Sequence, residues 1–160
     1  DRPDDVAAEI ALLQRLRELG LAGEALARLQ PREVDFANSA AWQAEYAVTL
    51  VYLNRRDQAV ERYRQSLRLD PDNPQRAVEL AMLLRERRAA GDLDEAWRWA
   101  EHASTLAPDA PSVLVCRAEL LALRGDLTGA LALYERAIRA LPVGSDRRRL
   151  FEQRAKALGR

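Results

Sequence analysis

Residues 125–142 read GDLTGALALYERAIRALP. Gly125 is a turn residue, and Ala130 lies four positions before Tyr134, so these two side chains share one face of a helix, one turn apart. Pro142 ends the periodic apolar segment because proline cannot continue a helix. The stretch therefore predicts a helix that follows a turn, stops before a proline and carries a small residue where a second helix can approach closely.

The same pattern occurs twice upstream, at residues 57–71 and 94–108, with Ala59 and Ala96 in the place of Ala130. Another amphipathic segment precedes each copy and also carries a small residue, in turn Ala47, Ala81 and Ala118. The spacing between successive copies is 34 or 37 residues. A period of this length predicts helix–turn–helix units that cannot bury their apolar faces alone and therefore stack on one another.

The longer period places three extra residues between Ala81 and Ala96. We assign them to Arg85–Ala90, which contains no helix breaker, and expect the first helix of that unit to be lengthened by about 4.5 Å. Turns are expected at Asn54, Gly91 and Gly125.

A degenerate unit opens the chain, with Gly20 at its turn and Ala25 located 34 residues before Ala59. Pro31 should cut its second helix short and leave a loop at Arg32–Ala37. A last helix is expected from residue 146, with the apolar stripe Leu150, Phe151, Ala155 and Leu158.

The predicted divisions are a degenerate first repeat with its loop (1–37), a second repeat (38–72), a third repeat with the insertion in its first helix (73–109), a fourth repeat (110–143), and a C-terminal capping helix or first helix of a truncated fifth repeat (144–160).

The period, the small residues, the aromatic in the second helix and the closing proline resemble the tetratricopeptide repeat (TPR). The resemblance covers roughly residues 4–142 and is strongest over Ala40–Pro142. The sequence departs from the family where Gln43, Ala77 and Leu114 replace a first-helix tryptophan. The resemblance implies an all-α fold, a right-handed superhelix (α-solenoid) of about four helix–turn–helix repeats plus a C-terminal helix, that serves as a non-enzymatic scaffold for protein–protein interaction.

The resemblance also implies that the first helices line a concave groove, which binds a peptide or helical segment of a partner. Without charged donors at Ala44, Val48 and Val78, the groove does not suit the carboxylate clamp that some TPR domains use. An apolar groove suits an amphipathic helix instead, unless its apolar side chains are simply half-buried by the next helix. The candidate partner-binding residues are Ala44, Val48, Val51, Val78, Met82, Arg85, Val115, Glu119 and Trp99.

Composition and motifs argue against other classes of function. The chain has 25 basic and 25 acidic residues, so no global positive field attracts nucleic acid, and no segment is apolar enough to insert into a membrane. One histidine, His102, and one cysteine, Cys116, are too few for a metal site, and we expect no cofactor and no catalysis. Trp97 and Trp99 cannot share a helix face, so we expect Trp97 in the core and Trp99 at the surface, either as a partner anchor or with its indole lying on the next turn of the helix.

Origin and partners are predicted only coarsely. The basic residues are arginines except Lys156, which suggests a GC-rich bacterial genome, and Asp1–Asp5 is neither a methionine start nor a signal peptide, so we expect a piece of a longer protein. One cysteine leaves the cytoplasm and the periplasm open, and family analogy alone favours the periplasm. By the same analogy, the alternative function is a structural or assembly arm of a bacterial envelope machine such as exopolysaccharide export or secretion. Basic Arg147–Arg149 and acidic Asp1–Asp5 predict weak head-to-tail self-association.

Overall fold

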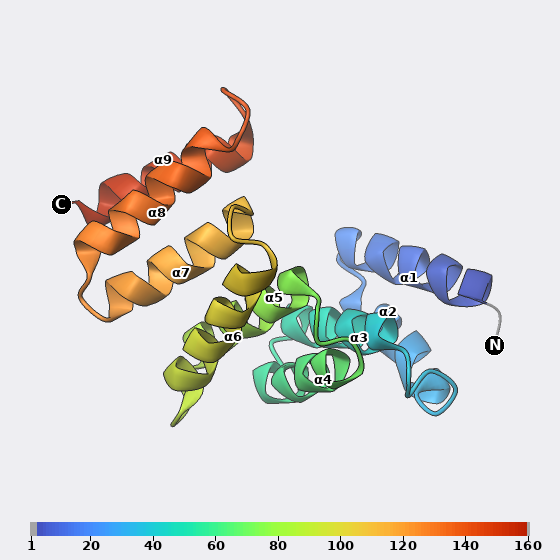
Figure 1. Cartoon of the computed structure of the whole chain (residues 1–160). Helices are drawn as coiled ribbons and strands as arrows, with labels where there is room; N and C mark the ends of the chain where they lie inside the picture. Colours follow the sequence, from blue (N-terminus) through green and yellow to red (C-terminus); the bar gives the residue numbers. More distant parts are fainter. Residues whose placement is uncertain (1–2, 160) are drawn as a thin grey trace. The chain divides into compact units, whose positions relative to one another are not determined.

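The computed structural model describes residues 3–159, and every regular element in that range is a helix (Figure 1). The helices divide into two compact units, residues 1–72 and 73–160. None of the helices in residues 3–159 combines the length and the apolar character that crossing a bilayer requires.

Unit 1 contains α1 (Pro3–Glu18), α2 (Ala22–Leu29), the short 3-10 helix η1 (Gln30–Arg32), α3 (Ala40–Tyr52) and α4 (Arg56–Leu69). Helices α3 and α4 form an antiparallel pair, and α1 and α2 both pack on α3. The prediction that Pro31 ends the second helix early is confirmed, because α2 has only 8 residues and continues as η1. The Glu9 carboxylate holds this short segment to α1 through Arg28 (2.8 Å) and Arg32 (3.3 Å).

Unit 2 contains α5 (Pro74–Arg87), α6 (Asp92–Leu106), α7 (Pro111–Leu123), α8 (Leu127–Arg139) and α9 (Asp146–Leu158). Helices α5 and α6 form one antiparallel pair and α7 and α8 another, with α7 packed on both members of the first pair. Helix α9 packs along α8, as Figure 1 shows at the red end of the chain. The all-helical, paired architecture expected from the sequence is therefore confirmed.

The small residues lie where the repeat pattern predicts close contact. Six alanines, one in each helix of the three pairs, have no exposed surface: Ala47, Ala59, Ala81, Ala96, Ala118 and Ala130. The expected turn residues adopt positive φ angles of 57° at Asn54, 80° at Gly91 and 84° at Gly125, a region that glycine and asparagine tolerate better than other residues.

The expected lengthening of α5 by three residues is wrong. Counted from the buried alanines, α5 gains one residue, the connection to α6 gains one and the start of α6 gains one. The cause is Asp92, whose buried carboxylate accepts hydrogen bonds from the Ala89 backbone N–H (2.8 Å) and from Arg87 (2.6 and 2.9 Å). Arg88 adopts a left-handed conformation, with φ 55°, and ends the helix.

The last helix is present at its predicted position, and Ser145 caps it by accepting a hydrogen bond from the Arg148 backbone N–H. Phe151 is buried in the apolar cluster of α7 and α8, but Leu150, expected in the same stripe, is 43% exposed. Asp1 lies outside the described residues, as do the side chains of Asp4 and Asp5. The head-to-tail self-association therefore stays a prediction.

The buried alanines yield a test with a matched control on one helix. Ala130→Asp should lower the free energy of unfolding by several kcal/mol, because an unpaired carboxylate would be buried between α7 and α8. Ala132→Asp, on the exposed side of α8, should cost less than about 1 kcal/mol, which is the difference in helix propensity. Chemical denaturation followed by circular dichroism measures both values, and equal losses would contradict the repeat phase.

Candidate functional site

The predicted groove residues of unit 1 form an exposed apolar strip on α3. Ala44, Val48 and Val51 lie at i, i+4 and i+7 and therefore share one helix face. Ala44 and Val48 are partly exposed and Val51 is 39% exposed. Tyr52, which the sequence analysis did not single out, follows at the end of the helix and is 62% exposed. We call these four residues the α3 strip.

A buried arginine connects α1 to α3. Arg17 is only 7% exposed, donates a hydrogen bond to Thr49 Oγ1 (3.1 Å) and forms an ion pair with Glu45. Gln14 also donates to Glu45, at 2.9 Å. Sequence reasoning missed this contact, because no pattern in the sequence distinguishes Arg17 from an arginine at the surface. The contact fixes the rotation of α3 relative to α1 and thereby orients the α3 strip.

In unit 2, two predicted groove residues are inaccessible. Val78 is 6% exposed and Val115 is 4% exposed, and Val115 belongs to the apolar cluster that contains Tyr134 and Phe151. The alternative that these side chains are covered by neighbouring helices therefore holds for both valines. Met82 stays partly exposed.

The other two groove residues of unit 2, Arg85 and Glu119, belong to a polar cluster that connects four helices. Arg85 Nη1 of α5 lies 2.9 Å from Glu119 Oε2 of α7, and Tyr134 of α8 donates a hydrogen bond to Glu119 Oε1 at 3.2 Å. Arg154 of α9 pairs with the same Oε1. Glu119 Oε2 and Arg85 Nε are buried without a well-oriented hydrogen bond. Two guanidinium groups share the Glu119 carboxylate, and Arg85 also lies 3.6 Å from the Glu86 carboxylate, so the charges of this Glu119 cluster balance.

The environment of this cluster shifts the pKa of two neighbouring groups. Burial, reinforced by the Glu119 charge, raises the pKa of the Tyr134 hydroxyl to about 12 and that of the Cys116 thiol to about 12. Cys116 is 1% exposed and stays protonated at neutral pH, which fits its prediction as a buried filler. Among residues 3–159, no three His, Cys, Asp or Glu side chains are placed to hold a metal ion.

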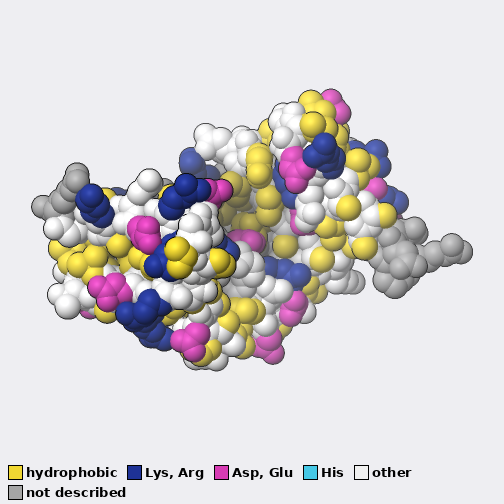
Figure 2. Space-filling model, turned by 90° about the horizontal axis from the view of Figure 1, so that it is seen from above, with side chains coloured by type: hydrophobic (Ala, Val, Ile, Leu, Met, Phe, Trp, Pro, Cys, Tyr) yellow, Lys and Arg dark blue, Asp and Glu magenta, His cyan; other side chains and the backbone are white. Residues whose placement is uncertain are grey.

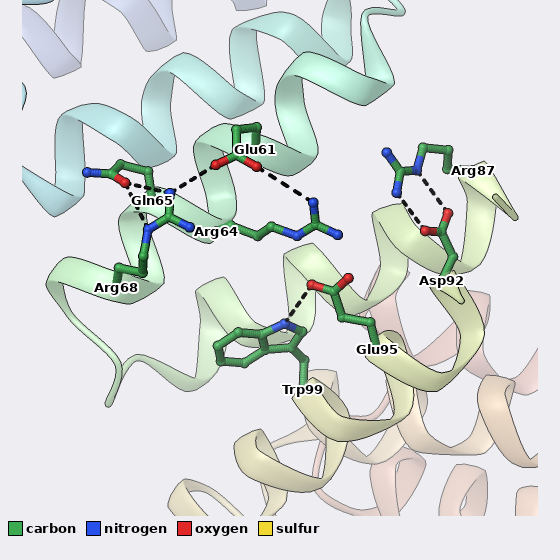
Figure 3. A network of polar contacts seen from close by, with 8 residues as sticks. All are labelled: Glu61, Arg64, Gln65, Arg68, Arg87, Asp92, Glu95 and Trp99. Carbon is green, nitrogen blue, oxygen red and sulfur yellow. Dashed lines mark hydrogen bonds and ion pairs between the residues drawn. The ribbon is translucent and has the colours of Figure 1, made fainter. Parts of the chain in front are cut away.

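The two tryptophans of α6 do not divide as expected. Both are partly exposed, so the prediction of a core position for Trp97 is wrong. The Arg124 guanidinium carbon lies 3.9 Å from the centroid of the Trp97 ring, a cation–π contact at the surface. Trp99 donates to Glu95 one turn back on the same helix, at 3.4 Å (Figure 3), and its ring meets His102 edge-on. The Trp99 indole therefore lies along its own helix.

Charged side chains of both signs are interspersed on the face that Figure 2 shows. The arginine run of α9 is partly neutralised within its own helix, since Arg148 pairs with Glu152 at 2.9 Å and Arg149 pairs with Asp146. This face therefore lacks the concentration of positive charge that is typical of a nucleic-acid surface.

Comparison with known proteins shows the fold and no more. No model of a protein family matches the sequence, and no curated protein matches it either. Solved structures do match. A thermophilic TPR protein of Thermus thermophilus, TTC0263, is 22% identical in sequence and superimposes with a TM-score of 0.76. The match covers 91% of this chain and 79% of the TTC0263 chain. Yeast Tom70 has 18% identity and a TM-score of 0.81, covering 98% of this chain and 33% of its own. PilF of Pseudomonas aeruginosa has 20% identity and a TM-score of 0.70, covering 91% of this chain and 65% of its own. The chain therefore has the fold of the TPR proteins.

The Glu119 cluster should contribute measurably to stability. Glu119→Ala leaves two guanidinium groups without their carboxylate and should cost about 2–3 kcal/mol, less than a fully buried pair because Arg154 is 41% exposed. Glu135→Ala removes an exposed carboxylate of α8 that forms only a long ion pair with Arg139, and should change the free energy of unfolding by less than about 0.5 kcal/mol. Denaturant titration of both variants measures their free energies of unfolding. A near-zero effect of Glu119→Ala would show that the cluster does not contribute to stability.

Cys116 offers an independent probe of unit 2. Its pKa, raised to about 12, keeps the buried thiol protonated at pH 8, so a thiol reagent at that pH should not react with the folded protein. Stoichiometric reaction should appear only in denaturant, where the pKa returns to about 8.5. Rapid labelling under native conditions would show that α7 opens readily.

Proposed function

We propose that the protein is a non-enzymatic scaffold that binds a peptide or helical segment of a protein partner along its first helices. The observation that carries the proposal is the α3 strip. Apolar side chains at i, i+4 and i+7 remain accessible on a helix that also contributes buried residues such as Trp42, Ala47 and Leu50 to the packing of unit 1. Such a strip complements the apolar stripe of an amphipathic helix.

Tyr52 is the strongest candidate for an anchoring contact in unit 1. Tyrosine offers a large apolar surface with a polar tip and is enriched among residues that dominate binding energy. The Arg17 guanidinium carbon lies 6.0 Å from the Tyr52 ring centroid, and Arg17 is itself held by Glu45 and Thr49. The ring is therefore supported on one side, which lowers the entropy that binding has to overcome.

Unit 2 adds a face of different chemistry. Met82 offers a flexible apolar contact, and the Glu119 cluster places the partly exposed guanidinium groups of Arg85 and Arg154 on the same carboxylate. This face therefore offers a partner segment an apolar contact beside paired charges. Trp99 of α6 is already occupied with Glu95 and His102, so it is a weaker candidate for a partner contact.

The chemistry of the titratable groups supports a binding role over a catalytic one. The Cys116 thiol is buried and protonated at neutral pH, which removes it as a nucleophile. The role of an envelope assembly arm stays a prediction that rests on family resemblance.

The α3 strip provides the test. The double substitution Val48→Glu with Val51→Glu should abolish capture of partner proteins identified by affinity capture and mass spectrometry, while helical circular dichroism stays unchanged. Val143→Glu, at an 88% exposed valine before α9, is the matched control and should capture the same proteins as the wild type. Undiminished capture by the double variant with normal helicity would refute binding at the strip.

A further inference from the structure

Unit 1 contains a cleft on the side of its second helices, away from the α3 strip. The cleft has a volume of about 500 Å³, within the range of ligand-binding cavities. One wall is the segment that continues from α2 through η1, the other wall is α4, and α3 forms the floor. Its defining residues are Glu33, Tyr46, Arg55, Gln58, Arg62 and Gln65. We call it the α2–α4 cleft.

Two features of the sequence create this space. Helix α2 stops at Leu29 and is followed only by the three-residue 3-10 helix η1, where the other repeats have a longer second helix. Gln43 of the floor is shorter than the tryptophan that the repeat pattern leads one to expect, and its amide is held by the Ala37 carbonyl at 3.1 Å. The side chain is thereby fixed, and the cleft stays open above it.

Arg62 of α4 crosses the cleft in a fixed position. Its guanidinium carbon lies 4.1 Å from the Tyr46 ring centroid, and its Nη1 donates to Gln43 Oε1 at 3.1 Å. Its Nη2 reaches Glu33 on the opposite wall at 2.6 Å. The Glu33 side chain is 43% exposed, and an ion pair of such exposure contributes little stability. A carboxylate supplied from outside can therefore replace Glu33 on an arginine that is already oriented.

The charge balance of the cleft also favours an acidic ligand. On the α4 wall, Glu61 already pairs with Arg68 at 2.9 Å, and Arg68 donates to Gln65 as well, as Figure 3 shows. Arg55, at the far end, makes no side-chain hydrogen bond or ion pair within the described part of the chain. Displacement of Glu33 would leave Arg62 and Arg55 as two cations facing the ligand.

The dimensions match a short stretch of extended chain. From Gln58 to Arg68 the α4 wall rises about 15 Å, which four or five residues of an extended peptide would span. Gln58 projects an amide group along this wall that can both donate to and accept from a peptide backbone, and the amide NH2 of Gln65, whose oxygen accepts from Arg68, can donate to one. We propose that the α2–α4 cleft binds an extended acidic peptide of four or five residues, with an Asp or Glu side chain replacing Glu33 on Arg62.

The probe for this site is an array of N-acetylated pentapeptides. The central residue is Glu, Gln or Lys, and the other positions are randomised. The 160-residue protein should be retained by Glu-centred spots above their Gln and Lys counterparts. Fluorescence anisotropy with the best Glu peptide then gives Kd values for the variants. Equal retention on Glu and Gln spots, or no retention, would overturn the proposal.

Two cleft variants should move affinity in opposite directions. Arg62→Gln should weaken binding at least about ten-fold, because a charged hydrogen bond is lost. Glu33→Gln should strengthen it roughly two- to five-fold, because the competing carboxylate is gone. A purely structural role of the Arg62–Glu33 pair predicts weaker binding in both variants, so an unchanged or raised Kd in Glu33→Gln would contradict displacement.

Controls separate this site from the α3 strip. Arg98→Gln, an exposed arginine of α6, should leave the Kd unchanged. If Arg62→Gln loses helicity, Arg55→Gln replaces it, since Arg55 is exposed, and it should also weaken binding. The α3 strip double variant should retain full binding to the array. Loss of array binding in that variant would place the peptide on the strip and overturn the cleft.

Discussion

The architecture depends on the close approach of helix backbones at alanine. In each of the three pairs, one alanine from each helix is completely buried, so a side chain larger than a methyl group would push the helices apart. Ser66 of α4 is a small polar residue that is buried in the same way, because its hydroxyl donates a hydrogen bond to the Ala40 carbonyl at 2.7 Å. Once the pairs are fixed in this way, helix geometry determines which face of each helix points away from its pair partner.

Apolar packing leaves several polar side chains inside each unit, and their pairing adds rotational specificity. Arg17 connects α1 to α3 in unit 1, and Glu119 connects α5, α7, α8 and α9 in unit 2. Alanine contacts permit small rotations of a helix, whereas a buried charge requires its partners in one arrangement. These clusters therefore set the orientation of the surfaces next to them, the α3 strip and the face around Met82.

Periodicity predicted the helices and their contacts, because small residues and turn residues leave a signal at each repeat. It could not predict which groove residues stay accessible. Ala44 and Val78 are equivalent in the pattern, yet only Val78 is buried, since exposure depends on what packs against each helix. The position of the insertion was also hidden, because it depends on the hydrogen bonds that one buried carboxylate, Asp92, accepts from Ala89 and Arg87. The sequence showed that Pro31 shortens a helix, but whether the following loop refills the space depends on its packing.

The two proposed surfaces of unit 1 share α3 but use separate faces of it. Val48 and Val51 lie on the strip, while Tyr46 and Leu50 line the α2–α4 cleft. A helix face is determined by position along the chain, so a substitution on one face leaves the side chains of the other in place. The early end of α2 opens the cleft without removing any side chain from the strip. A rigid helix held by Arg17 on one side and by Arg62 stacked on Tyr46 on the other can therefore present two independent binding surfaces within a single unit.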